Sequence, residues 1–241
     1  MSDFCELWPG GPLFCQSGHF RLGTDSVLLA DFVNTSSLRR GIDLGCGSGA
    51  IALLLLARDE KLKMTGLEIL PDAADTARAN LSANPCGARG SVVAGDIRES
   101  RRLFKSGEFD LAVSNPPYFA AGSGPSSPSG SRAAAREESA CTLEELCSAA
   151  AFLLRTGGGF FVVYRPERLA ELFCAMADCG IEPKRLRMVQ NTAFSAPSLV
   201  LAEGRRGGRP GLRMEPPLIL HESDGCETAE YKRIYHISGE A

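Results

Sequence analysis

Seven residues between a predicted strand and a predicted helix combine an acidic side chain with three glycines. The segment from Asp43 to Gly49 is Asp-Leu-Gly-Cys-Gly-Ser-Gly. Gly45, Gly47 and Gly49 permit a tight turn and a close backbone approach to a ligand, and the helix that follows presents unpaired N–H groups. The spacing is G-x-G-x-G rather than the dinucleotide pattern G-x-G-x-x-G. Asp43 precedes the turn, where a carboxylate could hold an ammonium group rather than a pyrophosphate.

A second carboxylate belongs to the same predicted site. Glu68 ends the next predicted strand, about 20 residues beyond the glycines, where an acidic side chain accepts hydrogen bonds from ribose hydroxyls. Together these residues describe a nucleoside with an amino-acid tail and no phosphate, which is S-adenosylmethionine. In this respect the chain resembles the class I methyltransferases. The alternative interpretation is a tight turn that binds no ligand.

This resemblance implies a fold and a third cofactor contact. The fold is a Rossmann-like α/β fold, with a seven-stranded, mostly parallel sheet, helices on both faces and the last pair of strands reversed. Asp96 follows the third predicted strand, where an Asp of this fold faces the adenine ring of the cofactor and accepts its exocyclic amine. On its own, Asp96 is more typical of a residue that caps the helix behind it.

A short proline-rich motif follows the fourth predicted strand. Its residues are the predicted catalytic residues Asn115, Pro116, Pro117 and Tyr118, and Asn115 is also a predicted cofactor contact. The prolines stiffen the backbone, so the Asn115 amide oxygen and a neighbouring carbonyl can together accept hydrogen bonds from one planar NH₂ group. Tyr118 offers a flat face on which a base can stack. We expect catalysis by orientation, because the sulfonium methyl group is already a good electrophile.

The motif resembles that of the amino-methyltransferases, which act on adenine N6, guanine N2 or a glutamine amide. Residues 20–30, which include Thr24 and Asp25, resemble the segment that closes over the methionine end of the cofactor. Five later segments resemble the bacterial valine-tRNA adenine-N6 methyltransferases, namely residues 164–169, 182–187, 207–208, 216–218 and 231–235. This resemblance implies S-adenosylmethionine as the cofactor, tRNA as the substrate, and methylation of the adenine beside the anticodon.

Two other functions stay open. A protein glutamine-N5 methyltransferase acting on release factors uses the same tetrapeptide, but it usually carries an added N-terminal helical domain, and only about 40 residues precede Gly41 here. A catalytically silent protein that binds cofactor and RNA is the other alternative. The intact motif at Asn115 disfavours it.

Length and composition predict one methyltransferase domain over residues 1–241. Within it, residues 1–40 would close over the cofactor, and residues 120–131, rich in Gly, Ser and Pro, would form a mobile loop. The longest apolar run, residues 50–57, is too short to span a membrane, and the N-terminus lacks a secretory signal, so we expect a cytoplasmic protein. The nine cysteines include no C-x-x-C pair, and we expect no metal site.

Short apolar runs alternate with amphipathic stretches, which predicts a parallel sheet between two layers of helices. The predicted strands are residues 41–44, 63–68, 91–94, 109–114, 159–164, 185–190, 198–202 and 217–221. The predicted helices are residues 50–58, 71–83, 143–154, 166–179 and 229–235. Residues 203–211 are predicted to form a glycine-rich basic loop.

Basic residues are concentrated late in the chain. Residues 184–213 contain seven Lys or Arg and one acidic residue, in a chain whose net charge is -3. This segregation predicts a surface for RNA phosphates, and the alternative is a solvated loop and strand face. The predicted RNA-binding residues are Arg132, Arg136, Lys184, Arg185, Arg205, Arg206 and Arg209.

Overall fold

A computed structural model describes residues 4–16, 22–116 and 141–237 of the chain. Strands and helices alternate along most of the described part. In chain order they are β1 (Cys5–Glu6), β2 (Leu13–Phe14), α1 (Thr24–Phe32), β3 (Arg40–Leu44), α2 (Ala50–Arg58), β4 (Lys63–Glu68), α3 (Pro71–Ser82), η1 (Pro85–Arg89), β5 (Gly90–Ala94), η2 (Ile97–Glu99), α4 (Ser100–Leu103), β6 (Phe109–Ser114), α6 (Leu143–Leu153), β7 (Leu154–Tyr164), η3 (Pro166–Arg168), α7 (Leu169–Asp178), β8 (Ile181–Gln190), β9 (Pro197–Arg206), β10 (Arg213–Met214), β11 (Leu218–Ile219) and α8 (Ala229–Ile234).

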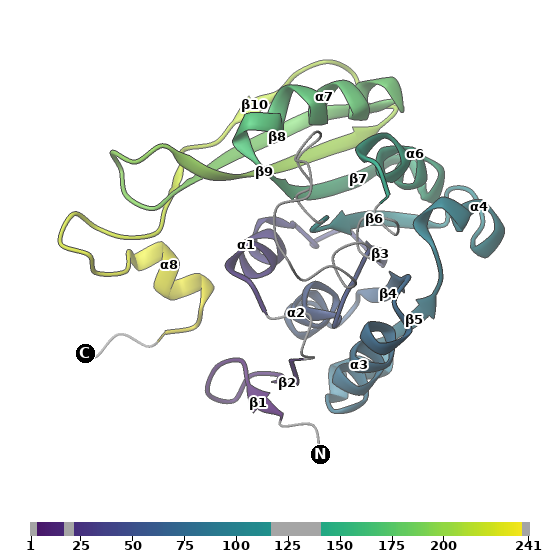
Figure 1. Cartoon of the computed structure of the whole chain (residues 1–241), viewed down its shortest axis with the longest axis horizontal. Helices are drawn as coiled ribbons and strands as arrows, with labels where there is room; N and C mark the ends of the chain where they lie inside the picture. Colours follow the sequence, from purple (N-terminus) through teal and green to yellow (C-terminus); the bar gives the residue numbers. More distant parts are fainter. Residues whose placement is uncertain (1–3, 17–21, 117–140, 238–241) are drawn as a thin grey trace, which may run out of the picture.

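The main sheet follows the order β5-β4-β3-β6-β7-β9-β8 (Figure 1). Strands β5, β4, β3, β6 and β7 are all parallel. Strand β9 is antiparallel to both β7 and β8, and the short β10 and β11 pair with β8. The predicted class, a mostly parallel Rossmann-like sheet of the α/β type, is confirmed.

Two details of the sheet differ from the prediction. Only β9 is reversed rather than a pair of strands, because β8 is antiparallel to β9 and therefore runs in the same direction as β7. The described sheet also has nine strands rather than seven, since β10 and β11 each add two residues beside β8. Strand β11 lies within the predicted strand at residues 217–221 and is shorter than predicted. Strand β10 was not predicted, because a segment of two residues carries no periodic signal.

Two strand ends differ from the predicted ones, in segments where glycines interrupt the apolar pattern of a strand. The predicted basic loop at residues 203–211 begins later, because β9 continues to Arg206, which pairs with Ile181. Strand β7 begins five residues before the predicted start, and it includes Gly157, Gly158 and Gly159, which have low strand propensity. Helix α1 was not predicted. Its buried residues Val27, Leu28, Leu29 and Ala30 are consecutive and show no helical period.

Helices cover both faces of the sheet (Figure 1). One hydrophobic cluster joins α1, α2 and α3 to side chains such as Leu111 and Phe161. The other joins α6 and α7 to the opposite-facing side chains of the same strands, such as Ala112 and Phe160. This alternation follows from the period of two along each strand. Among the described residues, no helix combines the length and apolar character needed to cross a membrane.

Local sequence signals set several helix ends. Thr142 and Glu145 form the expected capping box at the start of α6, each side chain bonding the other residue's backbone N–H. Pro71 opens α3, where its missing N–H leaves no bond unmade. Gly49 precedes α2 with a φ of 81°, in the left-handed region that favours glycine.

Candidate active site

The glycine loop connects β3, in the middle of the sheet, to α2. In register, Asp43 lies between Gly66 of β4 and Val113 of β6, so the loop that follows emerges at the carboxyl ends of three parallel strands. Gly45, Gly47 and Gly49 have φ values of 72°, 54° and 81°. A side chain at any of the three would strain the backbone, so the turn itself accounts for their spacing.

Asp43 is a buried carboxylate without a partner in the described part of the chain. Its side chain is fully buried, and neither carboxylate oxygen has a hydrogen-bond partner there. Burial is the main cause that raises the pKa of Asp43 to about 7. The backbone N–H of Ala52 opposes this rise in the pKa, and the nearby charge of Glu68 adds to it. Because a buried carboxylate without a partner is unfavourable, a cation that pairs with Asp43 would stabilise its ionised form.

Glu68 holds the glycine loop from the next strand. Its Oε2 atom accepts the backbone N–H of Gly47 at 2.8 Å, and its Oε1 atom accepts that of Leu70 at 2.9 Å. The residue is only 4% exposed. Because a carboxylate oxygen can accept more than one hydrogen bond, Glu68 can anchor the loop and also receive ribose hydroxyls.

Cys46 fills the space beneath the loop. Burial raises the pKa of its thiol, and the charges of Asp43 and Glu68 raise it further, which keeps the thiol protonated. Gly66 faces it from β4, and a Cβ atom there would lie 2.6 Å from the Cys46 sulfur. Cys46 and Gly66 therefore act together as packing residues.

The proline motif begins directly beside this loop. Ser114, the last residue of β6, donates its hydroxyl to the carbonyl oxygen of Leu44 at 2.8 Å. The Nδ2 atom of Asn115 donates to Ser26 Oγ in the first turn of α1 at 3.1 Å. Asn115 and Pro116 are half-buried, whereas Pro117 and Tyr118 lie outside the described residues. Asn115 is thus fixed at the carboxyl edge of the sheet, next to the glycine loop.

The other predicted cofactor residues lie at the same edge. Asp96 follows β5 and caps the short helix η2, accepting the backbone N–H of Arg98 at 2.8 Å and pairing with its guanidinium at 2.5 Å. The hydrogen bonds from Arg98 hold the pKa of Asp96 below its ordinary value. The capping alternative is therefore confirmed, and the adenine contact stays a prediction. Thr24 and Asp25 form the start of α1, beside Ser26.

Two residues that the sequence analysis did not identify support the site. Ser26 holds Asn115, and Asn80 of α3 holds the glycine loop from behind. Asn80 is fully buried, and its Nδ2 atom donates to the carbonyl oxygens of Ser48 at 2.9 Å and Cys15 at 3.0 Å. Its Oδ1 atom accepts the N–H of Cys15 at 2.7 Å. A buried Asn on the apolar face of a predicted helix is the signal that could have revealed it.

These residues fit a particular kind of ligand. The unpartnered carboxylate of Asp43 suits an ammonium group, and Glu68 suits adjacent hydroxyls. The glycine loop leaves room for close backbone contact. The donor set therefore fits the amino-acid and ribose parts of S-adenosylmethionine. Among the described residues, no group of three His, Cys, Asp or Glu is arranged to hold a metal ion.

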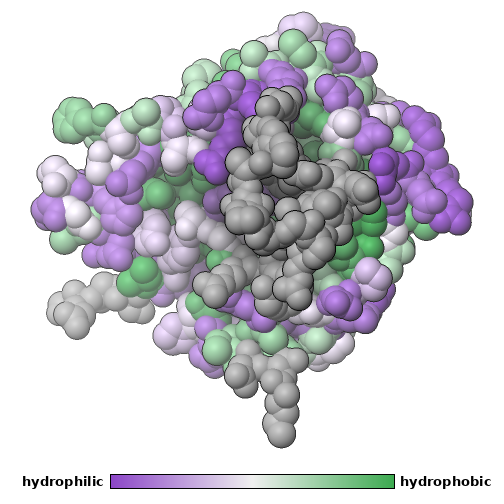
Figure 2. Space-filling model, viewed as in Figure 1, coloured by the Kyte–Doolittle hydropathy of each residue, from purple (hydrophilic) through white to green (hydrophobic). Residues whose placement is uncertain are grey.

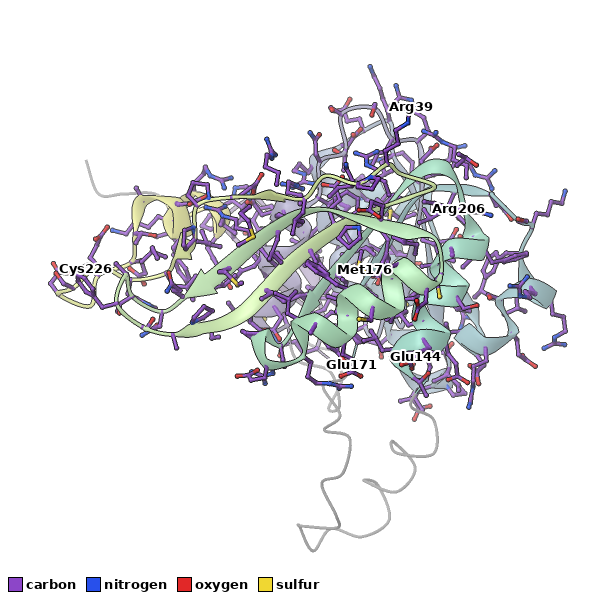
Figure 3. The ribbon with its side chains drawn as sticks, turned by 90° about the horizontal axis from the view of Figure 1, so that it is seen from above. Arg39, Glu144, Glu171, Met176, Arg206 and Cys226 are labelled. Atoms are coloured by element: carbon purple, nitrogen blue, oxygen red, sulfur yellow. The ribbon has the colours of Figure 1, made fainter. Side chains whose placement is uncertain are left out.

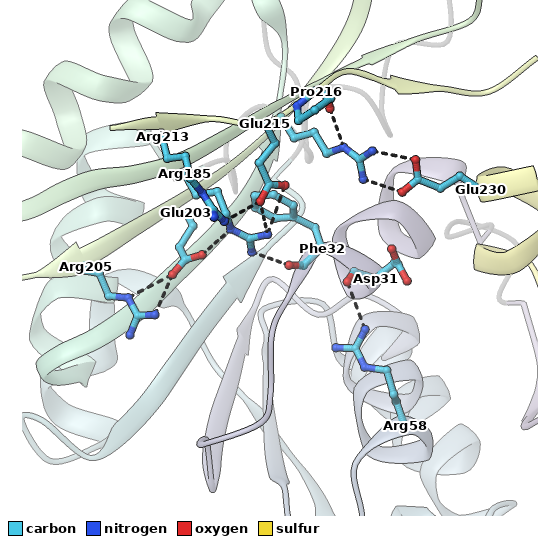
Figure 4. A network of polar contacts seen from close by, with 11 residues as sticks. Asp31, Phe32, Arg58, Arg185, Glu203, Arg205, Arg213, Glu215, Pro216 and Glu230 are labelled. Atoms are coloured by element: carbon cyan, nitrogen blue, oxygen red, sulfur yellow. Dashed lines mark hydrogen bonds and ion pairs between the residues drawn. The ribbon is translucent and has the colours of Figure 1, made fainter. Parts of the chain in front are cut away.

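Arg185, a predicted RNA-binding residue, instead belongs to a half-buried ion-pair network (Figure 4). Its Nε atom donates to Glu203 at 2.8 Å, and its guanidinium also pairs with Glu215 at 3.4 Å. The same group stacks over the ring of Phe32, 3.7 Å from the centroid. With an exposed side-chain fraction of 15%, Arg185 mainly ties β8 to β9 and α1.

Two other predicted RNA-binding residues, Arg205 and Arg206, lie at the edge of the sheet opposite Asn115. Because β9 runs antiparallel to β7, its last residues return toward the amino ends of the parallel strands, where Arg205 pairs in register with Gly159. Figure 3 labels Arg206 at this end of β9. Arg205 pairs with Glu203, and Arg206 donates to the carbonyl oxygen of Leu154. Lys184 and the exposed Arg209 lie nearby, joined by a hydrogen bond from Lys184 Nζ to the Arg209 carbonyl. Arg132 and Arg136 lie outside the described residues.

The family follows from a comparison with known proteins. Residues 13–174, which include the glycine loop and the proline motif, match the methyltransferase small domain family. The chain belongs to this family. A tRNA1(Val) (adenine(37)-N6)-methyltransferase of Porphyromonas gingivalis is 34% identical over 222 residues, which cover 89% of this chain and 86% of the relative. The protein of the same name from Aeromonas hydrophila is 31% identical, covering 89% and 88%.

Solved structures agree on the fold of this family member. A predicted O-methyltransferase from Agrobacterium tumefaciens superposes with a TM-score of 0.73 at 22% identity, covering 88% of this chain and 96% of the other. Geranyl diphosphate C-methyltransferase from Streptomyces coelicolor, solved with S-adenosyl-L-homocysteine, gives a TM-score of 0.55 at 14% identity, covering 75% and 78%. At these identities the likeness shows the methyltransferase fold alone.

Proposed function

We propose that this protein transfers a methyl group from S-adenosylmethionine to N6 of an adenine beside the anticodon of a tRNA. The relatives that are 31–34% identical over most of their length carry this activity in their names. The observation that carries the proposal is the position of Asn115, whose amide is held beside the glycine loop at the carboxyl edge of the sheet.

The chain's own residues divide into a cofactor group and a substrate group. Asp43 holds the ammonium group of the cofactor, Glu68 the ribose hydroxyls, and Asp96 the adenine amine. When bound, the cofactor supplies an electrophilic methyl group to the N6 lone pair, and N6 then releases a proton to water. Asn115 and the Pro116 carbonyl accept the N6 hydrogens and direct that lone pair toward the methyl group. A preorganised amide of this kind acts without a strong base.

The rest of the predicted arrangement is part of the proposal. Residues 1–40 close over the cofactor, Pro117 and Tyr118 complete the substrate site, and the protein works in the cytoplasm on tRNA. Of the described basic residues, Arg209 is the main candidate for contacts with the RNA backbone, together with Arg132 and Arg136. Lys184, Arg205 and Arg206 contribute less, because a carboxylate or a carbonyl already engages each of them.

Methyl transfer from labelled cofactor tests the proposal directly. We expect label in unmodified tRNA and N6-methyladenosine in the nuclease digest. Asn115→Ala, which retains Asp43, Glu68 and Asp96, should give almost no labelled tRNA. Label in a release factor but not in tRNA would indicate a protein glutamine-N5 methyltransferase instead. Cofactor binding without transfer to RNA or protein would indicate a catalytically silent protein.

A further inference from the structure

An aromatic side chain projects into solvent from the turn between β8 and β9. Phe194 is 96% exposed, whereas the next most exposed large hydrophobic side chain in the described residues, Met214, is 59% exposed. Figure 2 shows hydrophobic atoms that protrude from the surface of the protein at this turn. A fully solvated phenyl ring contributes nothing to the hydrophobic core, so its position has no explanation in the packing of the fold.

The turn that carries Phe194 is well ordered by its own hydrogen bonds. Gln190 Nε2 donates to the Ser195 carbonyl at 2.7 Å, and the Thr192 N–H donates to Ser195 Oγ at 2.9 Å. Asn191 Oδ1 lies 2.9 Å from His221 Nδ1, which connects the turn to the segment after β11. A ring presented by such a turn can bind a partner without a large loss of backbone entropy.

The register of the sheet places this turn above the active-site edge. Tyr164, the last residue of β7, pairs with Val200, so residues 197–199 of β9 extend past the end of β7 (Figure 1). Ser114 pairs with Val162, which pairs with Ala202, so Asn115 is level with Leu201. Four residues of β9 beyond that level correspond to about 13 Å along the strand.

The sideways distance is of similar size. Strands β7 and β9 separate β6 from β8, and neighbouring strands lie about 4.8 Å apart, so the turn is displaced from β6 by about 10–14 Å. The displacements along and across the strands combine to about 16–19 Å, which corresponds to about five stacked nucleotides of one RNA strand at about 3.4 Å each. The turn is therefore within reach of a base about five nucleotides from one that is held at Asn115.

We propose that Phe194 is a stacking site for an unpaired base of the substrate RNA, about five nucleotides from the adenine that is methylated. This inference rests on the proposed function. Residues 191–196 contain no charged side chain, so the turn suits the face of a base rather than a phosphate. Enzymes that bind single-stranded RNA commonly use exposed aromatic rings as stacking platforms.

Substitution of the ring separates stacking from the other contacts. Phe194→Ala should weaken binding of an unmodified valine-tRNA anticodon stem-loop by about 5- to 100-fold. The slope of log K against log salt should not change, because no phosphate contact is lost. Cofactor affinity and melting temperature should also stay the same. Phe194→Tyr should bind like the wild type, and so should Met214→Ala, a matched change of an exposed apolar side chain elsewhere.

Tryptophan fluorescence gives a second, direct measurement. The chain has a single tryptophan, Trp8, so Trp8→Phe combined with Phe194→Trp creates one reporter at the turn. We expect the stem-loop to quench its emission. Unchanged emission together with wild-type affinity of Phe194→Ala would overturn the stacking site while tRNA methylation by the wild type stands. Absence of tRNA methylation by the wild type would instead overturn the proposed function, and the stacking site with it.

Discussion

The amide of Asn115 donates to the hydroxyl oxygen of Ser26 at 3.1 Å, across 89 residues of sequence. The bond joins the first turn of α1 to the carboxyl end of β6. In the proposed reaction, the Ser26 hydroxyl holds the amide nitrogen of Asn115, and the amide oxygen accepts the hydrogens of the substrate amine. Ser26 is therefore a positioning residue for the motif, and α1 takes part in the active site.

Removal of either partner should affect turnover rather than cofactor binding. Asn115→Ala should lower kcat by about 100-fold or more, because an acceptor that orients the amine in the transition state is lost. Ser26→Ala should lower kcat by about 5-fold, the effect of one hydrogen bond of about 1 kcal/mol, and Ser26→Thr should restore it. Steady-state kinetics on tRNA and calorimetry with the cofactor measure both effects. An Asn115→Ala enzyme with more than half of wild-type turnover would contradict the assigned role.

Glu68→Ala should act on the cofactor instead. It removes the acceptor for the Gly47 N–H and the proposed acceptor for the ribose hydroxyls, so cofactor affinity should fall by about 1–3 kcal/mol. Isothermal titration with S-adenosylmethionine gives the value. Glu99→Ala, which removes only a solvent-exposed ion pair with Arg102, is the control and should leave affinity unchanged. Equal affinity of the two variants would rule out the ribose contact.

The buried carboxyl group of Asp43 should make stability and cofactor binding depend on pH in opposite ways. Its pKa is raised in the folded protein from 3.8 to about 7. The folded state therefore binds the proton more tightly than the unfolded state. Its contribution to stability is fully present below about pH 4 and is lost as pH rises toward 7, with a total of about 4 kcal/mol. In the proposed complex the ionised carboxylate of Asp43 binds the ammonium group of the cofactor, so cofactor affinity should increase between pH 6 and pH 8.

Asp43→Asn provides the comparison for this pH dependence. Without the cofactor, the variant should become more stable relative to the wild type as pH rises from 4 to 7, as measured by chemical denaturation at each pH. Its cofactor affinity should be low and nearly independent of pH between pH 6 and pH 8, the range over which the affinity of the wild type increases. Parallel stability profiles for the two proteins would show that Asp43 does not titrate there.

Two arginines of the same basic segment should behave differently. Arg185→Ala leaves Glu203 buried beside fewer cations, so it should lower the free energy of unfolding by about 3 kcal/mol. Arg209 is exposed, and none of the ion pairs in the described part of the chain includes it. Arg209→Ala should keep wild-type stability and flatten the salt dependence of tRNA binding by about one unit of slope. If tRNA binding by Arg209→Ala has the salt dependence of the wild type, Arg209 does not contact an RNA phosphate.

The sequence alone determined the parts of this protein that depend on neighbouring residues. Gly45, Gly47 and Gly49 predict a tight turn because left-handed φ values are a local requirement, and all three have them. The capping box at Thr142 is local in the same sense. Glu68 and Asn115 could be assigned to one edge because parallel strands bring their carboxyl ends together, whatever the detailed packing.

Only the tertiary structure decided which distant residues meet. The seven basic residues of segment 184–213 predicted one RNA surface, but cross-strand pairing joins Arg185 to Glu203, and the reversal of β9 carries Arg206 to the far edge. The contact between Ser26 and Asn115, and the exposure of Phe194, also depend on strand order and register. Neither a count of charges nor a local sequence pattern specifies which strands become neighbours. The contact between Ser26 and Asn115 and the exposure of Phe194 therefore could not be predicted from the sequence.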